Sequence, residues 1–493
     1  MRKRKELKAK FTVTREQDMA KDNQFVKEIA DIETDFPQWY TDVVLKTKLV
    51  DYGPVKGTMV IRPYGYAIWE NIQREMDGRF KKAGVENAYF PLLIPMSFMT
   101  KEAEHVEGFA PEVAVVTHAG GEKLQEPLVV RPTSETIIGH MFGKWIESWR
   151  DLPLRQNQWC NVMRWEKTTR PFLRTSEFLW QEGHCVFASG EEAEKETLDM
   201  LALYGEFAKS VLCMPVLTGK KTEKEKFAGA VATYGMEAMM HDGKSLQSGT
   251  THYMGQNFAK AFDVQFTDKD GTLHYGYTMS YGVSTRLIGA LIMTHGDQRG
   301  LVLPPPVAPV QVVIVPIAMK KDGVLEACEK LAEELKAAGI RVKVDDTDNS
   351  PGWKFNEWEM KGVPVRIELG PRDIENGVMT TFRRDMCEKG ETAREGAAEN
   401  IKALLDDISL KLYERAKARM DERIVTVKTL DELLSGVEGG FARAGWCGER
   451  ACEDKVKEFA QATARVMDNS HTEKTCVCCG KKAKHTVFFA RAY

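Results

Sequence analysis

Residues 161–184 constrain the fold of this chain more than any other stretch. Chemically active side chains stand there at alternate positions: Arg164 and Glu166, then Phe178, Trp180, Glu182 and His184. Residues i and i+2 of a strand point to the same face, so two strands joined by a loop around Lys167–Pro171 would gather them all on one face. Such a face suits a site that binds a charged, flat ligand. The alternative is an exposed hairpin that carries an Arg–Glu pair.

Residues 276–297 predict a strand that turns into a helix. Ser284 or Thr285 would cap this helix, and Arg286 would lie in its first turn. A cation is unfavourable at a helix N-terminus, so Arg286 needs a reason to be there, such as an anionic ligand. The apolar run Leu287–Met293 that follows indicates a buried core helix.

Composition excludes several classes of protein. The chain is 43% hydrophobic and 29% charged, as in ordinary globular proteins, and no apolar run approaches the roughly 20 residues that span a bilayer. The basic tail at residues 1–20 lacks the apolar stretch of a secretory signal, so we expect a cytoplasmic location. A net charge of −3 leaves any contact with RNA to local basic patches.

Proline and helix signals divide the chain into domains. The proline-rich segment 304–309 predicts a stiff linker between an α+β domain at 21–303, built around an antiparallel sheet, and an α/β domain at 310–392. A long charged helix at 396–419 opens a small third α/β domain at 393–493. In the second domain we expect helices at 323–338 and 353–360 and strands at 310–317, 340–344, 363–369 and 378–384.

Five of the ten cysteines gather between residues 447 and 479. Two pairs, Cys447 with Cys452 and Cys476 with Cys479, fit a tetrahedral thiolate site for zinc, and Cys478 competes with either member of the second pair. Four thiolates leave no open position, so we expect a structural Zn²⁺ rather than disulfides. Free thiols in a surface tail are the alternative.

Three segments resemble motifs 1, 2 and 3 of the class II aminoacyl-tRNA synthetases: residues 53–80, 161–184 and 276–297. Further sequence segments are similar to those of prolyl-tRNA synthetases of the archaeal and eukaryotic type: RPTSET, LQSGTTHYMGQNF, PGWKFNEWEMKGVPVRIELGPRD and the terminal ARAY. This resemblance runs from about Phe36 to Tyr493. It implies a catalytic domain, an anticodon-binding domain and a C-terminal zinc-binding domain. It also implies a homodimer through motif 1, in which Pro63 has no catalytic role.

The implied activity is the ATP-dependent attachment of proline to tRNA(Pro) through prolyl-adenylate, with Mg²⁺. The chain has no Gly-rich phosphate loop, so arginine side chains must hold the phosphates. Arg164 and Arg286 would be catalytic, and Phe178 would stack on the adenine with Arg286 on its other face. The resemblance assigns ATP binding to Arg164, Glu166, Arg174, Thr175, Phe178, Gln247, Thr250 and Arg286. An ion pair between Arg164 and Glu166, and a core position for Phe178, are the structural alternatives.

The resemblance also assigns a proline site. Its residues would be Thr133, Glu135, Arg164, Trp180, Glu182, His184, His252 and Ser284. A hydroxyl and a carboxylate, from Thr133 and Glu135, would satisfy the two N–H donors of the secondary ammonium. Alternatively, Thr133 caps a helix that starts at Ser134, and His252 is a structural residue in its strand.

Candidates for anticodon contact are Glu368, Arg372 and Arg383, with a solvated charged edge as the alternative. The interval 185–275 is too short for the editing insertion of bacterial-type prolyl enzymes, so we expect no editing in cis. The main competing hypothesis is a catalytically silent tRNA-binding or regulatory paralogue. A synthetase for another small amino acid and a zinc-dependent interaction module are further alternatives.

Overall fold

The structure, a computed structural model, describes residues 29–105 and 113–493, so the predicted basic tail at 1–20 lies outside it. The described residues form two compact units. The first contains 29–50, 62–67 and 295–412, and the second contains 51–61, 68–294 and 413–493 apart from the undescribed stretch. In the part of the chain that the structure describes, no helix is both long enough and apolar enough to cross a membrane.

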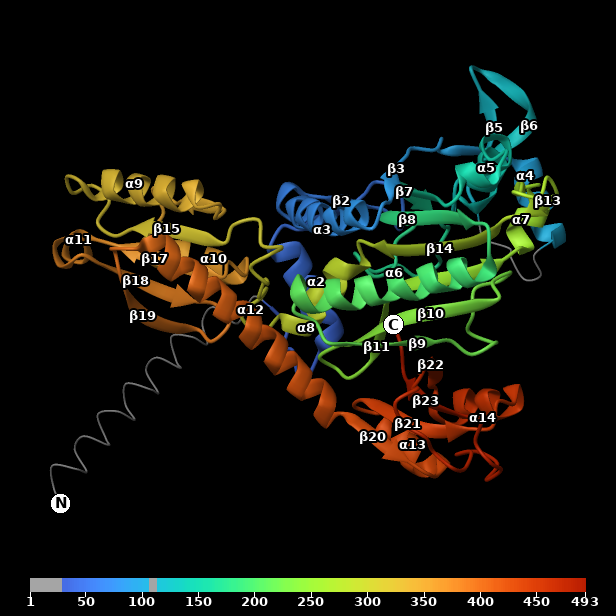
Figure 1. Cartoon of the computed structure of the whole chain (residues 1–493). Helices are drawn as coiled ribbons and strands as arrows, with labels where there is room; N and C mark the ends of the chain where they lie inside the picture. The colour runs from blue at the N-terminus through green and yellow to red at the C-terminus, as the bar shows by residue number, and fades with distance from the viewer. Residues whose placement is uncertain (1–28, 106–112) are drawn as a thin grey trace. The chain divides into compact units, whose positions relative to one another are not determined.

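A seven-stranded sheet forms the centre of the second unit (Figure 1). Neighbouring strands are antiparallel except for the first pair, which is parallel. The predicted α+β domain around an antiparallel sheet is therefore confirmed. In spatial order the strands are β3 (Glu86–Asn87), β7 (Leu154–Met163), β8 (Glu177–Phe187), β14 (Tyr277–Ser284), β11 (Ser245–Gly255), β10 (Ala232–Met239) and β9 (Val216–Lys220).

Helix α6 (Gly190–Ser210) lies along one face of this sheet (Figure 1). It starts where Ser189 caps its N-terminus. The Tyr204 hydroxyl on α6 donates a hydrogen bond of 2.7 Å to Gln181 Oε1 on β8. Because side chains alternate along a strand, the neighbours Trp180 and Glu182 point to the opposite face. That face is left for a ligand site.

The predicted hairpin at 161–184 exists, but its loop is longer than expected. Met163, the last residue of β7, pairs with Glu177, so residues 164–176 form the loop. Within it the backbones of Arg170 and Arg174 exchange hydrogen bonds of 2.7 and 3.0 Å, which turns the chain back on itself and prevents further pairing. The strand positions predicted for three residues were therefore wrong: Arg164, Glu166 and Arg174.

The predicted strand-to-helix turn at 276–297 is confirmed. Strand β14 ends at Ser284, and α8 spans Arg286–His295. The Ser284 hydroxyl accepts a hydrogen bond of 3.2 Å from the backbone N–H of Arg286. The apolar side chains of α8, among them Leu287 and Leu291, are fully buried.

Shorter elements occur in both units. The helices are α2 (Phe36–Lys46), α3 (Pro63–Lys82), α4 (Met96–His105), α5 (Glu135–Trp145), the short 3-10 helix Trp149–Asp151 and α7 (Asn257–Ala261). Of these, α2 belongs to the first unit, and α3 has residues in each. The strands are β1 (Val50–Tyr52), β2 (Met59–Ile61), β4 (Leu93–Pro95), β5 (Val115–Ala119), β6 (Glu122–Val130), β12 (Gln265–Thr267) and β13 (Leu273–Tyr275). Pro63 is the first residue of α3, where its missing N–H removes no helical hydrogen bond.

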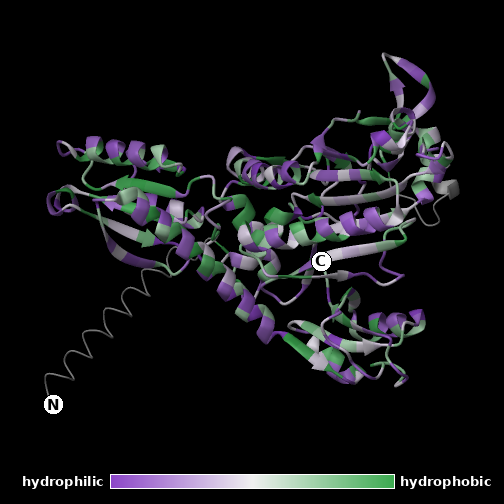
Figure 2. Cartoon of the chain, viewed as in Figure 1, coloured by the Kyte–Doolittle hydropathy of each residue, from purple (hydrophilic) through white to green (hydrophobic). Residues whose placement is uncertain are grey.

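The first unit holds a five-stranded mixed sheet. Its strands are, in spatial order, β16 (Val342–Val344), β15 (Val312–Pro316), β17 (Val365–Leu369), β18 (Val378–Arg383) and β19 (Glu388–Ala393). Its helices are α9 (Val324–Ala337), α10 (Pro351–Met360) and α11 (Pro371–Asn376). Figure 2 shows β15 as a hydrophobic strand and α9 as a mixture of both residue kinds, which is how the sequence predicted them. The sequence did not predict α11 and β19.

The proline-rich segment 304–309 is fixed rather than loose. The guanidinium of Arg341 donates hydrogen bonds of 2.7, 2.9 and 2.8 Å to the carbonyls of Pro305, Pro306 and Ala308. Helix α12 (Ala397–Glu422) follows the sheet, and the division between the two units falls within this helix, after Leu412. The domain limits at 303, 310 and 393 stay a prediction.

The chain ends in a small four-stranded α/β fold within the second unit, as predicted. Its strands are β20 (Ile424–Val427), β21 (Phe441–Trp446), β23 (His485–Ala490) and β22 (Thr463–Met467), in spatial order. Two helices, α13 (Leu430–Gly436) and α14 (Arg450–Ala460), complete it. Leu433, Val456 and Phe489 are buried in its core.

Candidate active site

A cavity of about 290 Å³ opens on the face of the seven-stranded sheet that α6 does not cover. It brings together most of the side chains that the sequence assigned to ATP or proline. These are Thr133, Glu135, Arg164, Phe178, Trp180, Glu182, His184, Gln247, Thr250, His252, Ser284 and Arg286.

Three adjacent strands form the floor of this cavity. Rows of paired residues cross β8, β14 and β11: Glu182, Gly282 and Thr250 in one row, and His184, Ser280 and His252 in the next. The middle strand contributes only small side chains at these positions. The rows therefore leave space above β14 in which a ligand fits between the polar groups of β8 and β11.

A β-bulge brings Gln247 to the cavity. Gly249 pairs with Met236 and Gln247 pairs with Glu237, so Ser248 is an extra residue in β11. The bulge resets the alternation, and Gln247 and Thr250 both line the cavity although they are three residues apart.

Arg164 stands at the rim of β7 with its guanidinium in the cavity. Its Nε donates a hydrogen bond of 3.0 Å to the Pro132 carbonyl, and its guanidinium carbon lies 5.6 and 5.4 Å from the ring centroids of Phe178 and Trp180. Burial lowers the pKa of Arg164, although nearby carboxylates, first Glu135, oppose this shift. An arginine stays protonated in proteins, so the site holds a half-buried cation with donors available to an anion.

Glu166, Arg174 and Thr175 do not line the cavity, although the sequence assigned them to ATP. The Glu166 carboxylate pairs with Arg174 at 3.3 Å, so the alternative in which it pairs with Arg164 is not observed. The Thr175 hydroxyl donates a hydrogen bond of 2.7 Å to the Glu177 carbonyl. These positions reflect the long loop, which carries the three residues away from the strand face.

Arg286 places a second cation in the cavity. Its Nε donates to the Leu173 carbonyl at 3.0 Å, and Nη1 donates to the Gln247 carbonyl at 3.4 Å. Burial lowers the pKa of Arg286, and the charges of Arg174 and Arg164 lower it further. An anionic ligand would relieve both the burial and the repulsion between the arginines.

Thr133 and Glu135 lie at the start of α5. The Thr133 hydroxyl donates a hydrogen bond to the Glu135 carboxylate. Ser134, not Thr133, is the N-cap of α5, and its hydroxyl donates to Glu182 instead of capping the helix. The alternative in which Thr133 caps the helix was therefore wrong, because its hydroxyl turns to the carboxylate in the cavity.

Glu182 and His184 form a buried pair at 3.2 Å. Burial alone would lower the pKa of His184, but the hydrogen bond to Glu182 raises it above its usual value. Burial likewise opposes ionisation of Glu182, yet the bond to His184 keeps the pKa of this carboxyl low. Gln158 also donates to Glu182 at 2.6 Å, which helps to hold the carboxyl group in place.

His252 has the opposite character. It is half-buried, and desolvation of its ring, helped by the charges of His184 and Lys221, lowers its pKa to about 3. Its Nδ1 lies 3.0 Å from the Thr233 hydroxyl, and its ring centroid lies 4.7 Å from that of Phe227. The cavity thus contains one imidazole whose pKa is raised and one whose pKa is lowered.

Several residues that line the cavity were not predicted: Lys221, Glu225, Lys226, Phe227, Thr233, Ser248, Gly249, Ser280, Tyr281, Gly282 and Val283. Extending the alternation back from Ser284 would have found Ser280 and Gly282. Residues 221–227 carry no periodic signal, and their charges are typical of a solvated loop.

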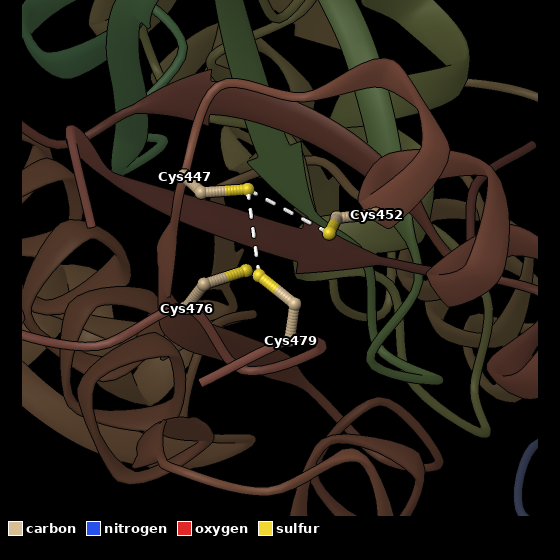
Figure 3. A group of neighbouring side chains, drawn as sticks. All are labelled: Cys447, Cys452, Cys476 and Cys479. Carbon is tan, nitrogen blue, oxygen red and sulfur yellow. Dashed lines mark hydrogen bonds between the residues drawn. The ribbon is translucent and has the colours of Figure 1, made fainter. Parts of the chain in front are cut away.

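The four predicted cysteine ligands meet in the C-terminal fold. Figure 3 shows their thiols pointing toward one another, and all four sulfurs lie within 4.8 Å of each other: Cys447, Cys452, Cys476 and Cys479. The Cys447 sulfur lies 3.6 Å from that of Cys452 and 3.8 Å from that of Cys479. Tetrahedral Zn–S bonds of about 2.3 Å place sulfurs about 3.8 Å apart, so the group fits a metal ion.

Cys478 lies outside this group. Its thiol donates to the Cys452 carbonyl at 3.1 Å. All ten cysteines lie in the described part of the chain, and none of them forms a disulfide there. The arrangement favours Cys476 and Cys479 over Cys478 as partners of the first pair.

The anticodon candidates are not brought together. Glu368 is opposite Thr380 and Arg383 is opposite Val365, so they lie toward different ends of the β17–β18 pair. The Glu368 carboxylate accepts hydrogen bonds from the Arg366 guanidinium at 3.0 and 3.2 Å and from the Lys389 ammonium at 2.9 Å.

Arg383 and Arg372 differ in their surroundings. The Arg383 guanidinium donates to Asp385 at 2.9 and 2.8 Å and to Asp407 at 2.7 Å. Arg372 is exposed on α11. Of the two arginines, Arg372 has the more accessible charge.

Comparison with known proteins decides the family. The anticodon binding domain matches residues 311–404, the class II tRNA synthetase core domain (G, H, P, S and T) matches 117–295, and the C-terminal domain of prolyl-tRNA synthetase matches 430–493. A proline–tRNA ligase of Alkaliphilus oremlandii is 60% identical over 96% of this chain and 99% of its own. The chain belongs to the proline–tRNA ligase family.

Other members of this family agree. Proline–tRNA ligase 2 of Clostridioides difficile is 57% identical over 96% of this chain and 100% of its own. The crystal structure of prolyl-tRNA synthetase from Cryptosporidium parvum, complexed with halofuginone and AMPPNP, has a TM-score of 0.90 and 41% identity, covering 94% of this chain and 99% of that one. The resemblance predicted from the three motifs is confirmed.

Proposed function

We propose that the cavity activates proline with ATP and that the chain then transfers the prolyl group to the terminal ribose of tRNA(Pro). One observation carries this proposal: the cavity joins two half-buried arginines to a hydroxyl–carboxylate pair. The arginines suit phosphate and carboxylate groups, and the pair suits an ammonium. The cavity thus presents cations to the phosphate and carboxylate groups of the substrates and a carboxylate to the ammonium group of proline. The silent paralogue is not favoured, because Arg164, Phe178 and Arg286 all face the cavity.

The first step would be attack of the proline carboxylate on the α-phosphorus of ATP. A C–O–P bond forms as the bond to pyrophosphate breaks, and negative charge grows on the phosphoryl oxygens. We assign the stabilisation of this charge to Arg164 and Arg286, since preorganised cations lower such a barrier without a covalent enzyme intermediate. Mg²⁺ bound with ATP would neutralise further phosphate charge.

The proline site would occupy the end of the cavity near His184. Glu135 and Thr133 would accept the two N–H donors of the secondary ammonium, and Trp180 would supply an apolar wall for the ring. The Glu182 carboxylate already has three protein partners, Ser134, Gln158 and His184. We therefore assign it to holding the floor, and we assign the neutral His252 to lining the pocket.

Phe178, Gln247, Thr250 and Ser284 would line the nucleotide and adenylate. We no longer assign Glu166, Arg174 and Thr175 to direct contact with ATP in this conformation, since they lie outside the cavity. Arg372, whose charge is exposed, is the proposed anticodon contact. Glu368 suits a structural role better, because it is buried and its carboxylate already accepts hydrogen bonds from Arg366 and Lys389. Arg383 suits a structural role better, because Asp385 and Asp407 occupy its guanidinium.

Two further assignments concern assembly. We propose that Cys447, Cys452, Cys476 and Cys479 bind a structural Zn²⁺, whose four thiolates would leave no position for a substrate.

We also propose a homodimer through motif 1. Tyr52, Val55 and Val60 expose 59%, 51% and 53% of their surface around the β1–β2 ribbon, which gives a partner an apolar patch. None of the ten cysteines, all of which lie in the described residues, forms a disulfide, which suits the reducing cytoplasm where we expect the chain to act.

Amino-acid-dependent ATP–pyrophosphate exchange, measured with each of the twenty amino acids, tests the proposed function. We expect strong exchange with proline. Exchange with another amino acid would overturn the proline site but keep the arginine assignments. A folded, zinc-loaded chain that exchanges with none would restore the silent paralogue.

The interval between motifs 2 and 3 supports a further expectation. It is filled by α6 and by β9, β10 and β11 of the same sheet. We therefore propose that the chain does not hydrolyse alanyl-tRNA in cis. Deacylation of alanyl-tRNA(Pro) by the purified chain would overturn this expectation.

A further inference from the structure

One wall of the cavity is a loop that connects β9 to β10. We call residues 221–227 the wall loop; its members Lys221, Glu225, Lys226 and Phe227 line the cavity. The Phe227 ring lies against the His252 ring, with centroids 4.7 Å apart, and the Phe227 backbone N–H donates to Thr233 at 2.9 Å. The wall loop therefore closes the end of the cavity that we assign to proline.

Helix α14 of the C-terminal fold holds the middle of the wall loop. The Thr222 hydroxyl donates a hydrogen bond of 2.9 Å to Glu453, and the Lys224 ammonium donates one of 2.6 Å to Asp454. Thr222 and Glu453 are 2% and 3% exposed, so their bond is shielded from water. Neither residue lines the cavity.

Strand β22 of the same fold holds the start of the wall loop. The Lys221 ammonium donates to Glu237 at 2.8 Å and to the Arg465 carbonyl at 3.2 Å. The Arg465 guanidinium in turn donates to both oxygens of Glu237 at 3.0 to 3.2 Å. All three residues are buried, and a buried polar network whose members are all bonded has little freedom to move.

The backbone shows that this attachment is close. A side chain at Gly219, on β9, would overlap the carbonyl of Met467 on β22. Glycine is thus required for the two strands to lie this near to each other. The catalytic sheet and the C-terminal fold belong to one compact unit, and the wall loop is joined to that fold at two points.

We propose that the C-terminal fold is a positioning element for the proline pocket, in which Glu453 acts through Thr222 to hold the wall loop over the bound amino acid. The proposal rests on the proposed function. Breaking the bond between these two residues would let the wall loop open, so proline would bind more weakly. The nucleotide end of the cavity, formed by Arg164, Phe178 and Arg286, would be unaffected.

The test is steady-state ATP–pyrophosphate exchange with proline and ATP varied in turn, on the full chain. Glu453→Leu removes the acceptor at similar volume, and Thr222→Val removes the donor. We expect each to raise KM for proline about tenfold, equivalent to about 1.4 kcal/mol and typical of a buried hydrogen bond that loses one partner. KM for ATP and kcat should stay within about twofold, and Glu453→Gln, which keeps an acceptor, should restore KM for proline.

The double variant decides whether the two residues act through each other. If they do, Thr222→Val with Glu453→Leu should raise KM for proline no more than either change alone. Additive effects, equal rises in KM for proline and ATP, or a parent-like KM for proline in both single variants would overturn the proposal. If the parent shows no proline-dependent exchange, the proposed function fails instead.

Two controls separate the wall loop from general damage to the C-terminal fold. Arg450→Ala changes an exposed side chain of α14, 3.9 Å from Asp454, and should leave both KM values unchanged. Glu453 follows Cys452, so zinc content is measured for every variant. A Glu453→Leu chain that loses zinc while Thr222→Val keeps the parental KM would assign the effect to the cysteine cluster and overturn the proposal.

Discussion

Two polar regions of this molecule resemble each other in sequence and differ in structure. In the cavity, the Arg164 guanidinium bonds to a backbone carbonyl and rests against two aromatic rings. At the end of β18, the Arg383 guanidinium is occupied by two carboxylates, Asp385 and Asp407. A charged strand end becomes a ligand site only where the protein leaves the charge without a full set of partners.

The pKa shifts of these two arginines show the same contrast. Burial lowers the pKa of Arg164, whereas the hydrogen bonds of Asp385 and Asp407 outweigh burial and raise the pKa of Arg383. Burial disfavours the charged form of Arg164, and an anionic ligand would offset this free-energy cost. Arg383 is already stabilised by the fold.

Replacing Arg164 gives the largest effect that we expect. Arg164→Ala should lower proline-dependent ATP–pyrophosphate exchange at least about a hundredfold, because it removes a preorganised donor to the phosphoryl group. The circular dichroism spectrum should not change. Arg150→Ala, an exposed arginine on the short helix at 149–151, is the matched control and should exchange like the parent. Exchange by Arg164→Ala within tenfold of the parent would remove Arg164 from the site.

The cavity shows what alternation in a sequence does and does not reveal. Phe178, Trp180, Glu182 and His184 lie on one strand, and their common face followed directly from their spacing. Arg164 reaches the same cavity from a loop, so its predicted strand position was wrong, although its side chain lines the cavity with theirs. The role of Arg164 was assigned from the family resemblance, because residues in a loop show no periodic pattern from which their positions could be predicted.

Other parts of the site depend on contacts between distant segments. Gln247 reaches the cavity through the bulge at Ser248, which appears only once β10 and β11 are paired. The wall loop is fixed by Glu453 and Asp454, more than two hundred residues away in the sequence. The cysteine cluster was predictable because its pairs Cys447–Cys452 and Cys476–Cys479 are local, whereas only the structure separates Cys478 from them.

The cysteine cluster offers the next test. In contrast to the open cavity, its four thiolates would fill every coordination position of a bound Zn²⁺. Cys447→Ser should reduce bound zinc from one ion per chain toward none and lower the unfolding temperature of the C-terminal fold, because metal binding stabilises such small folds. Cys478→Ser removes a neighbouring thiol that lies outside the cluster, so this variant should keep its zinc. Elemental analysis of both variants, purified without added chelator, measures this difference. Unchanged zinc in Cys447→Ser would exclude it as a ligand.

The two imidazoles of the cavity predict opposite pH dependences of stability. His252 has a pKa of about 3 in the folded chain and about 6.5 when unfolded, so its contribution to stability is lost as pH falls below 6.5, by up to about 1.4 kcal/mol per pH unit. The pKa of His184 is raised, so the stability that it contributes is present below pH 6.5 and is lost as pH rises through its folded pKa.

Urea unfolding between pH 5 and 9 checks both signs, with a range chosen around the usual histidine pKa of about 6.5. His252→Gln should flatten the acidic side of the curve, and His184→Gln should flatten the alkaline side. If the free energy of unfolding depends on pH as steeply in each variant as in the parent, the assigned pKa shifts are contradicted. The NMR signal of His252 should also fail to titrate across this range.

The smallest effects are expected in the first unit, where they sharpen the comparison between Arg164 and Arg383. Arg372→Ala removes an exposed charge and should raise KM for tRNA(Pro) in aminoacylation about threefold, as the loss of one phosphate or base contact would. Arg383→Met should instead lower the free energy of unfolding by about 1 to 3 kcal/mol, because it removes the guanidinium that pairs with the buried Asp385, and should leave KM for tRNA(Pro) unchanged. KM for proline serves as the control in both variants. A larger rise in KM for tRNA(Pro) in Arg383→Met than in Arg372→Ala would show that occupied guanidinium groups also contact RNA. The contrast between free and satisfied charge would then fail as a rule for locating sites in this chain.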